Sequence, residues 1–496
     1  MKKTIFTRLL SVLLFAVILT GAFSCAGREE PVAPGSGDEG TESETVPAET
    51  RLQADLPEMT FDGYTFTIVH WDLPGMTPIY NDLYAEETDG DPIIDEVFRR
   101  NARISEALDV EFAFSYVEFH ELIEDCRTCV NTSDDMYDLV FVRMHESPEL
   151  MMEGDLLDFE HDFKYVDLDK PWWDQGLRRE LNFADHLFIA SSDISIQDNQ
   201  DTYAMAFNKK IAKDNGIEDL YELVRNGEWT LEKLYSLSSE TSHDNNGDGA
   251  IDPMEDLVGF LASDDTTISF FFSMGGRFTE KDEFGYPEFC YNTEESYDIV
   301  SEILDFMYDE STVRLEKGYP IHNDVCFRAN RALFTNIAIY NSIAWRGEDG
   351  LDFGILPAPT KEEGDDLLAL VSRHHCGLMS VLRCEENADT VGYIMEAMAA
   401  FSHYELQEAY YDITLKTKTA RDDESEEMLD LIFSHRTTDI GEVCNFGNFP
   451  TEILRLASNG RQKTDLASTY ARCESLIQSD IEHFAEQVDK IDEMRG

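Results

Sequence analysis

Hydrophobic and polar residues follow two different periods in the first part of this chain. Residues 64–71 alternate between the two kinds and are rich in Tyr, Thr, Ile and Val, which predicts a strand. Apolar positions then recur at helical spacing in two segments and form compact runs in two others. The predicted order is a helix at 91–107, a strand at 110–114, a helix at 119–130 and a strand at 137–142. This alternation predicts βαβ units and a mainly parallel sheet with helices on both faces.

A second group of elements follows a long extended stretch at residues 187–208. The patterns that follow predict helices at 209–215 and 230–240, β-rich segments at 332–340 and 351–357, and mostly helix from 386 onward. Two crossings of the chain, near 191–203 and near 330–380, would give two interleaved lobes. We therefore predict an α/β, two-lobed fold. Its first lobe comprises residues 56–197 and about 330–375, and its second comprises 198–329 and about 376–496.

The N-terminus has the pattern of an export signal. Lys2, Lys3 and Arg8 precede an apolar run at residues 9–19, and small residues lead to Cys25. The apolar run is about half of the roughly 20 residues that a membrane-spanning helix needs. We expect residues 1–24 to be a signal peptide.

Cys25 follows small residues at the expected cleavage point, which resembles a bacterial lipobox, although Ala22 stands where that pattern usually has Leu. The resemblance implies that the Cys25 thiol is acylated. Residues 25–55 are rich in Pro, Gly, Ser, Thr and Glu and cannot bury much apolar surface. They are expected to form a flexible, lipid-anchored linker.

The chain is strongly acidic. Its 496 residues include 101 Asp and Glu against 39 Lys and Arg, which gives a formal charge of −62, or −65 after the three basic residues of the signal are removed. This excludes a nucleic-acid-binding protein that uses a general basic surface. A hydrophobic fraction of 42% is nevertheless enough for a sizeable core.

One segment, residues 244–255, matches the twelve-residue calcium loop of the helix-loop-helix type. Calcium takes several oxygen ligands at once, and the alternating spacing directs them toward one point. Gly249 stands at the sharp turn. The predicted ligands are Asp244, Asn246, Asp248, the carbonyl of Ala250, Asp252 and Glu255. We expect a structural calcium site, with a solvated Asn/Asp/Gly turn as the alternative.

Several short motifs together resemble the extracellular solute-binding lipoproteins of bacterial ABC importers, of the sugar-binding family 1 type. The motifs include Phe-Arg-Arg-Asn at 98–101, Pro-Trp-Trp at 171–173, Phe-Asn-Lys-Lys at 207–210, Gly-Glu-Trp-Thr at 227–230 and Asp-Phe-Gly-Ile-Leu-Pro-Ala-Pro at 352–359. The resemblance implies capture of a carbohydrate between two lobes that close about a hinge. It also implies delivery to an ABC permease, and a lipid anchor that holds the protein on the outer side of the cell membrane.

Candidate ligand contacts come first from the carboxyl ends of the predicted parallel strands, where ligands gather in such sheets. These are Trp71, Asp72 and His145, with Arg143 and Met144 beside them. An aromatic ring next to a carboxylate or guanidinium suits a sugar, because the ring covers its apolar face and the polar group binds hydroxyls. On this basis we add Trp172, Trp345 and Arg346. Ser192 and Asp193 lie at the first crossing, where they could hydrogen-bond a ligand, and Gly276 lies in a loop where the backbone could approach one closely. For Trp172 a packing role explains the motif equally well, and Ser192 and Asp193 could instead shape the hinge.

Two other classes of protein are alternatives. A secreted carbohydrate-active enzyme is not favoured, because the sequence has no nucleophile elbow, zinc-protease helix or phosphate loop. His374 and His375 would point to opposite faces if residues 368–382 were extended, which argues against a shared metal. Cys126 and Cys129 have redox spacing but follow no strand, so we expect a structural role. A surface sensor or adhesion lipoprotein that binds without transport stays an alternative.

Overall fold

The computed structural model describes residues 52–72, 82–217, 219–315, 323–345, 348–411, 423–457 and 466–495. Residues 52–496 form one compact unit. The expected signal peptide, Cys25 and most of the expected linker lie outside the described residues. Within the described ranges, no helix has the length and hydrophobicity required to cross a bilayer.

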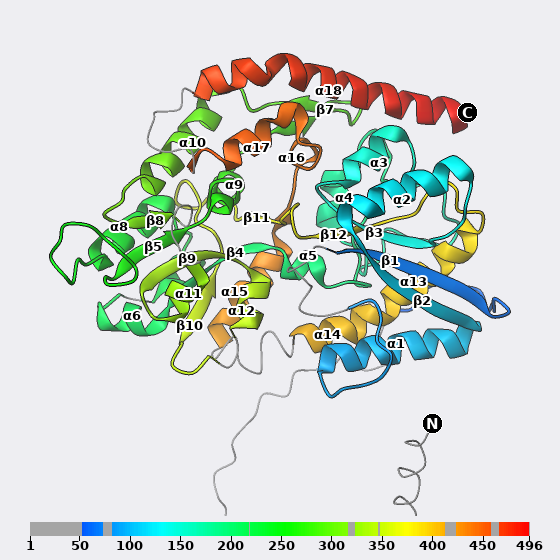
Figure 1. Cartoon of the computed structure of the whole chain (residues 1–496), viewed down its shortest axis with the longest axis horizontal. Coiled ribbons are helices and arrows are strands. Elements are labelled where there is room, and N and C mark those ends of the chain that lie inside the picture. Colours follow the sequence, from blue (N-terminus) through cyan, green and yellow to red (C-terminus); the bar gives the residue numbers. More distant parts are fainter. Residues whose placement is uncertain are drawn as a thin grey trace, which may run out of the picture. The chain divides into compact units, whose positions relative to one another are not determined.

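The first lobe is built on a four-stranded sheet in the order β12-β3-β1-β2. Its strands are β1 (Tyr64–Asp72), β2 (Val110–Glu118), β3 (Leu139–Arg143) and β12 (Gly377–Ser380). β1 is parallel to both β2 and β3, as the alternation of strands and helices predicted, and β12 is antiparallel to β3. Helices α1 (Pro92–Leu108), α2 (Phe119–Thr132), α13 (Ala388–Tyr404) and α14 (Leu406–Tyr411) belong to this lobe (Figure 1).

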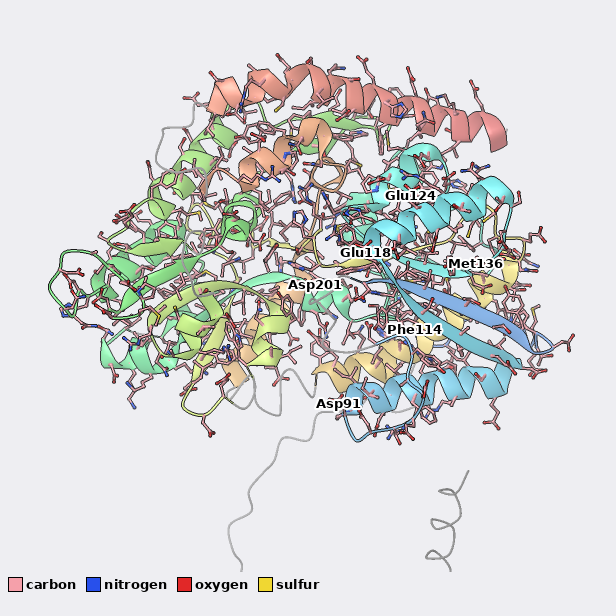
Figure 2. The ribbon with its side chains drawn as sticks, in the orientation of Figure 1. Asp91, Phe114, Glu118, Glu124, Met136 and Asp201 are labelled. Atoms are coloured by element: carbon pink, nitrogen blue, oxygen red, sulfur yellow. The ribbon has the colours of Figure 1, made fainter. Side chains whose placement is uncertain are left out.

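Side chains that cap the helices fix where they begin. The Asp91 carboxylate accepts a hydrogen bond from the amide of Ile93 at 2.9 Å, and Pro92 occupies the first turn of α1. Glu118 at the end of β2 likewise accepts from the amide of His120 at 3.0 Å and starts α2. Asp91 and Glu118 are labelled in Figure 2. These caps explain why the predicted helix starts fall within a residue of the observed ones.

The second lobe contains a mixed five-stranded sheet in the order β10-β4-β9-β5-β8. Its strands are β4 (Tyr203–Asn208), β5 (Val258–Ala262), β8 (Val313–Leu315), β9 (Ala332–Ala338) and β10 (Phe353–Leu356). β4 is antiparallel to β9 and β10, whereas β5 is parallel to β8 and β9. The α/β class and the two-lobed architecture are confirmed, although this second sheet is mixed and not mainly parallel.

The strand pairing differs from the expected lobe boundaries. β9 and β10 lie within residues 330–375, which we assigned to the first lobe, but they pair with β4 in the second sheet. β12 lies after residue 376, in the part assigned to the second lobe, but it pairs with β3 in the first. The chain therefore returns to the first lobe between β10 and β12, later than predicted. The reason is that β9 and β10 pair with β4, one on each side of it. Hydrophobic periodicity does not reveal such pairing.

The remaining elements lie between and around the two sheets. They are α3 (Ser147–Glu153), α4 (Gln175–Leu181), α5 (Gln197–Gln200), α6 (Lys209–Asp214), α7 (Leu220–Arg225), α8 (Leu231–Thr241), α9 (Asp264–Ser273), α10 (Glu294–Met307), α11 (Asn323–Arg328), α12 (Ile339–Ala344), α15 (Asp423–Ser434), α16 (Ile440–Val443), η3 (Phe446–Asn448), α17 (Phe449–Leu454) and α18 (Leu466–Arg495). Two short ladders add β6 (Thr279–Lys281) with β7 (Pro287–Phe289), and β11 (Ala369–Leu370) with β13 (Arg436–Thr437). The stretch expected to be extended at 187–208 is interrupted by α5 before β4 begins.

The C-terminal helix α18 contacts elements on both sides of the molecule. It packs against α3 after β3, and against η3, α17 and β7 (Figure 1). Phe484 of α18 lies between Phe183, with ring centroids 4.4 Å apart, and Phe446, at 5.8 Å. Aromatic contacts of this kind stabilise the helix against the body. α18 therefore links the segments of Phe183 and Phe446, which lie about 260 residues apart in the sequence.

Arg100, in the motif Phe-Arg-Arg-Asn, is one of the largest fully buried side chains. Its guanidinium donates to the carbonyls of Ile194 at 2.7 Å and Leu83 at 2.9 Å. Burial lowers its pKa to about 10, so it stays charged at neutral pH. The five donors of arginine thus fasten two loops to α1, because each loop carbonyl gains a charged partner in the interior.

Candidate functional site

Two chain segments that connect the lobes lie next to each other. Thr202 and Val371 form an isolated antiparallel bridge, and the amide of Ser372 donates to the carbonyl of Asp201 at 2.8 Å. The hydroxyl of Tyr203, the first residue of β4, lies 2.9 Å from Ser372 Oγ. Asp201 is labelled between the two halves of the ribbon in Figure 2. We call residues 200–203 and 371–376 the connecting segments.

The second connecting segment runs along the carboxyl end of β3. The amide of His145 donates to the carbonyl of Arg373 at 3.0 Å. This pairing brings the imidazoles of His145 and His374 together, with ring centroids 4.8 Å apart. The next residue, His375, has its ring 6.1 Å from that of Tyr340, which belongs to α12 of the second lobe. The histidine cluster, defined as His145, His374 and His375, therefore lies where residues of both lobes meet.

All three imidazoles of the cluster are held in their neutral form. Burial, together with the positive charges of Arg373 and Arg143, lowers the pKa of His145 to about 4 and that of His374 to about 2. Burial and Arg143 lower the pKa of His375 to about 4. A neutral imidazole has one donor and one acceptor nitrogen. His145 Nδ1 is buried and has no hydrogen-bond partner among the described residues, so the cluster has unused polar capacity. This chemistry suits hydroxyl groups, which both donate and accept.

The positive charge of Arg143, at the end of β3, is balanced by the carboxylate of Glu146. Its Nε donates to Glu146 Oε2 at 2.5 Å, and its second terminal nitrogen forms an ion pair with the same carboxylate. The guanidinium also lies over the ring of Phe119, 4.1 Å from its centroid. Because Glu146 balances this charge, Arg143 does not create a site for a free anion.

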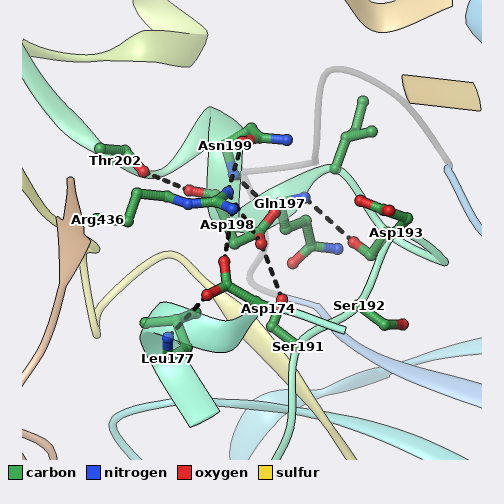
Figure 3. Close-up of polar contacts among 12 residues, drawn as sticks. Asp174, Leu177, Ser191, Ser192, Asp193, Gln197, Asp198, Asn199, Thr202 and Arg436 are labelled. Carbon is green, nitrogen blue, oxygen red and sulfur yellow. Dashed lines mark hydrogen bonds and ion pairs between the residues drawn. The ribbon is translucent and has the colours of Figure 1, made fainter. Parts of the chain in front are cut away.

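A buried charge network lies beside the connecting segments (Figure 3). Arg436 of β13 forms ion pairs with Asp174 at 2.5 Å and with Asp198 at 3.0 Å. Asp198 also accepts a hydrogen bond from Ser191 Oγ at 2.9 Å. Burial raises the pKa of Asp198 to about 6. For Arg436, burial lowers the pKa, but the two carboxylates outweigh burial and raise the pKa of the guanidinium above its usual value. The network ties β13 to α4 and α5.

The two residues predicted at the end of β1 have different environments. Trp71 is only 4% exposed, stacks on His70 at 5.6 Å, and fits against Gly377, where a Cβ atom would lie 2.7 Å from its Nε1. Among the described residues its ring is enclosed, which does not favour the expected stacking role. Asp72, the last residue of β1, is partly exposed at the strand end as predicted.

The residues predicted near the first crossing are mostly engaged in packing. Trp172 is 1% exposed, and its indole N–H donates to Glu396 Oε1 at 3.0 Å. Ser192 is buried, with Oγ 3.1 Å from the sulfur of Met379. Asp193 Oδ2 lies 2.6 Å from His403 Nδ1. These contacts favour the alternative that we gave for all three residues, packing and hinge structure, over direct contact with a ligand.

The predicted residues of the second lobe are also in its core. Gly276 fits against Phe271, whose ring lies 2.3 Å from where a Cβ atom would be. Trp345 is 4% exposed and packs between Phe327 at 5.2 Å and Phe353 at 5.6 Å. Both are therefore explained by packing. Arg346 lies outside the described residues.

The acidic loop at 244–255 has a backbone compatible with the calcium prediction. Asp244 accepts from the amides of Gly247 at 2.6 Å and Gly249 at 2.8 Å, and these bonds lower its pKa. Gly249 has φ +88°, a left-handed conformation that glycine adopts readily. Asn246 Nδ2 lies 2.6 Å from Glu255 Oε2, which brings the middle of the loop to its last residue. The loop is followed by β5 and not by a helix.

The histidine cluster was not predicted from the sequence. Residues 368–382 were expected to form one extended segment, whereas residues 373–375 form a turn between β11 and β12. In that turn His374 lies beside His145 and His375 beside Tyr340, so the argument from two opposite faces of an extended segment does not apply. The adjacent pair His374-His375 was the signal in the sequence for this cluster. The sequence does not show that the pair lies beside the end of β3. Cys126 and Cys129 are buried in α2 with raised pKa values, as a structural role requires.

Comparison with solved structures identifies the fold. A sugar transporter protein from Rhizobium etli in an open conformation matches with a TM-score of 0.57 and 11% identity, over 86% of this chain and 99% of that one. UspC of Mycobacterium tuberculosis matches with a TM-score of 0.56 and 13% identity, over 84% and 100%. A cyclo/maltodextrin-binding protein in complex with maltotetraose matches at 0.54 and 11%, over 86% and 96%. No protein-family model matches the sequence, and no curated protein is significantly similar to it.

These similarities define a class of protein by its architecture. The chain has the two-lobed α/β fold of the solute-binding proteins of ABC transporters, and the match extends over more than four fifths of its length. Of these structures, the Rhizobium etli protein is described as a sugar transporter, and the cyclo/maltodextrin-binding protein holds maltotetraose.

Proposed function

We propose that this protein is an extracellular solute-binding lipoprotein that captures a carbohydrate between its two lobes and delivers it to an ABC permease. The observation that carries the proposal is the fold match, which covers both lobes and includes a maltodextrin-binding protein in complex with its oligosaccharide. A binding role of this kind needs no catalytic residues. Some of the structural neighbours are named as binding proteins.

The chemistry of the junction between the lobes supports a neutral ligand. The histidine cluster supplies uncharged donors and acceptors, and Tyr340 adds an aromatic ring from the second lobe. Arg143 is balanced by Glu146. A free anion would also be repelled by the net charge of the chain. Asp72, partly exposed at the end of β1, is the predicted residue that we retain as an acceptor for hydroxyls.

Ligand capture would follow from contacts with both lobes. A ligand held by His145 in the first lobe and Tyr340 in the second favours the conformation in which both contacts form at once. The connecting segments at residues 200–203 and 371–376 would accommodate the motion. The Arg436 network lies beside them and would keep β13 fixed to α4 and α5.

Two further properties belong to the proposal. We infer that residues 1–24 are removed, that Cys25 carries a lipid, and that the body is held on the outer side of the cell membrane by residues 25–55. We also infer that calcium binds the loop at 244–255 as a structural ion, with Asp244, Asp248 and Glu255 among its ligands. The compatible backbone of that loop supports this inference.

The test is a ligand screen by thermal shift with mono-, di- and oligosaccharides, followed by calorimetry on the hits. We expect at least one neutral saccharide to bind, and His145→Ala to weaken its binding by about tenfold or more, equal to about 1.4 kcal/mol. Glu124→Ala, on the exposed face of α2, serves as the control with unchanged affinity. Binding of peptides alone would overturn the substrate class, and release of smaller products from an oligosaccharide would instead identify an enzyme.

A further inference from the structure

Three side chains with metal-binding atoms gather in the first lobe, away from the histidine cluster. They are Asp158, His161 and His186, and their nitrogen and oxygen atoms all lie within 4.8 Å of one another. Asp158 Oδ2 is 2.9 Å from His161 Nδ1 and 2.6 Å from His186 Nδ1. One carboxylate oxygen therefore faces two imidazole nitrogens.

The Asp158 carboxylate is fixed in this orientation. Its side chain is fully buried, and its other oxygen, Oδ1, accepts hydrogen bonds from the amides of Glu160 and Leu187, both at 3.0 Å. Two backbone donors on Oδ1 prevent rotation of the carboxylate without loss of both bonds. Oδ2 is consequently held toward the two histidines.

His186 has a carboxylate oxygen at each of its ring nitrogens. Nδ1 faces Asp158, and Nε2 lies 3.2 Å from Oδ1 of Asp492, near the C-terminal end of α18. A metal ion on Nδ1 would leave the single proton of the imidazole on Nε2, where it is donated to Asp492. Histidine ligands of metals commonly have such a carboxylate at their second nitrogen.

We propose that Asp158 Oδ2, His161 Nδ1 and His186 Nδ1 bind a divalent transition metal of the Zn²⁺ type, with Asp492 orienting His186. Two imidazoles and one carboxylate are a set that zinc accepts, and three protein ligands leave a fourth position for water or another small ligand. A metal at the centre would need the ligand atoms about 3.3 Å apart, slightly more than the 2.9 and 2.6 Å that separate Asp158 Oδ2 from the two imidazole nitrogens. His161 can supply this movement because its side chain is 48% exposed.

The surroundings provide access to this site. His161 also lines a cavity of about 640 Å³, together with Glu160, Gln175, Arg178 and Asn182. Water and small ligands can therefore reach the fourth position. Because Asp492 belongs to α18, metal binding would also strengthen the attachment of that helix to the first lobe. This site is independent of the proposed carbohydrate site, whose residues it does not share.

The experiment uses Co²⁺, whose visible absorption reports its coordination, added to the purified protein in excess Ca²⁺ so that the acidic loop at 244–255 is not available. We expect the absorption bands of a four-coordinate Co²⁺ site, abolished by an equivalent of Zn²⁺. His161→Ala should lose them, and because His161 is half exposed this variant should fold. His120→Ala, an exposed histidine of α2, should retain them.

Asp492→Asn gives a second test, because this side chain is exposed and is not itself a ligand. It should weaken Zn²⁺ binding by about tenfold or more if Asp492 orients His186. Failure of the wild-type protein to bind Co²⁺ or Zn²⁺ would overturn the site. Binding of equal strength in wild type and His161→Ala would show that the metal lies elsewhere, and would overturn it equally.

Discussion

Arg436 Nη2 lies 2.5 Å from Asp174 Oδ2, which joins β13 to the residue that caps α4, 262 positions earlier in the chain. A second nitrogen, Nη1, pairs with Asp198 at 3.0 Å. The side chain of Arg436 is 16% exposed, and those of Asp174 and Asp198 are each 6% exposed. One buried cation thus compensates two buried anions at the place where the chain passes between the lobes.

We predict that Arg436→Met lowers the free energy of unfolding by about 3–5 kcal/mol, because both carboxylates would be left buried and uncompensated. Urea denaturation at neutral pH measures it. The loss should be smaller at pH 5, since Asp198, whose pKa is already raised to about 6, takes up a proton more readily without the arginine. Arg225→Met is the control: Arg225 pairs with Glu427 on the surface, and its loss should change stability little.

A further variant separates the charge effect from packing. Combining Arg436→Met with Asp174→Asn and Asp198→Asn removes the two anions as well, and should recover a large part of the lost stability. No recovery in this triple variant would mean that the network acts through the shape of the side chains and not through their charges.

Trp172 and Trp173 both donate their indole N–H to one carboxylate, that of Glu396 on α13, at 3.0 and 2.9 Å. We predict that Trp172→Phe lowers stability by about 1–2 kcal/mol, since the hydrogen bond is lost from a buried acceptor. The affinity for the saccharide found in the screen should change by less than about twofold. Trp173→Phe should behave in the same way. A tenfold loss of affinity with unchanged stability would restore Trp172 to the ligand site.

Calcium should stabilise the protein through the loop at 244–255. Without a cation, Asp244, Asp248 and Glu255 repel one another, and EGTA should therefore lower the melting temperature. Asp248→Ala should have the lower melting temperature and no longer respond to calcium. Asn245→Ala changes the second loop position, which supplies no ligand, and should respond as wild type does. An identical response of all three proteins to EGTA would contradict the assignment.

Local sequence signals determined much of the fold. β1, α1 and α2 could be predicted because the apolar period and the end residue agree in each: α1 begins at Pro92 after Asp91, and α2 begins after Glu118. The lobe boundaries could not be predicted in this way. β9 and β10 belong to the second sheet because they pair with β4, and such pairing depends on contacts distant in the sequence.

The site was predictable only in part. The strand-end rule led to Asp72 and His145, which lie at the carboxyl ends of β1 and β3, but it could not distinguish an exposed ring from a buried one. Trp71 is covered because Gly377 lets β12 approach it closely, and Trp345 because Phe327 and Phe353 enclose it. These neighbours come from other strands and helices, and so burial at the end of a strand is decided by tertiary packing.

Cys25 provides a test of the proposed location. If its thiol is acylated, the protein expressed in its native host should partition into the detergent phase, and Cys25→Ser should shift it to the aqueous phase or the culture fluid. Cys384→Ser, far along the chain, should leave the partition unchanged. Recovery of both the wild type and Cys25→Ser in the aqueous phase would indicate ordinary signal cleavage without a lipid.

The histidine cluster predicts how ligand binding depends on pH. His145 and His375 have pKa values near 4, and that of His374 is near 2, so all three stay neutral throughout pH 5.5–8. The dissociation constant of the saccharide should therefore be constant over this range. Calorimetry at pH 5.5, 6.5 and 8 measures it. An affinity that changes tenfold around pH 6.5 would mean that an ordinary, titrating histidine binds the ligand and would contradict the assigned cluster.

The same shifts predict the dependence of stability on pH. Each imidazole has a folded-state pKa below its unfolded value of about 6.5, so its contribution is complete above pH 6.5 and is lost as the pH falls toward 4. His374→Gln removes one such group, because glutamine cannot take up the proton. Relative to wild type, this variant should lose less stability between pH 6.5 and 4.5, measured by urea denaturation at each pH. His120→Gln, whose side chain is exposed on α2, should follow the wild-type curve. If His374→Gln also follows that curve, the imidazole of His374 is not held neutral by burial, and its place in the cluster is wrong.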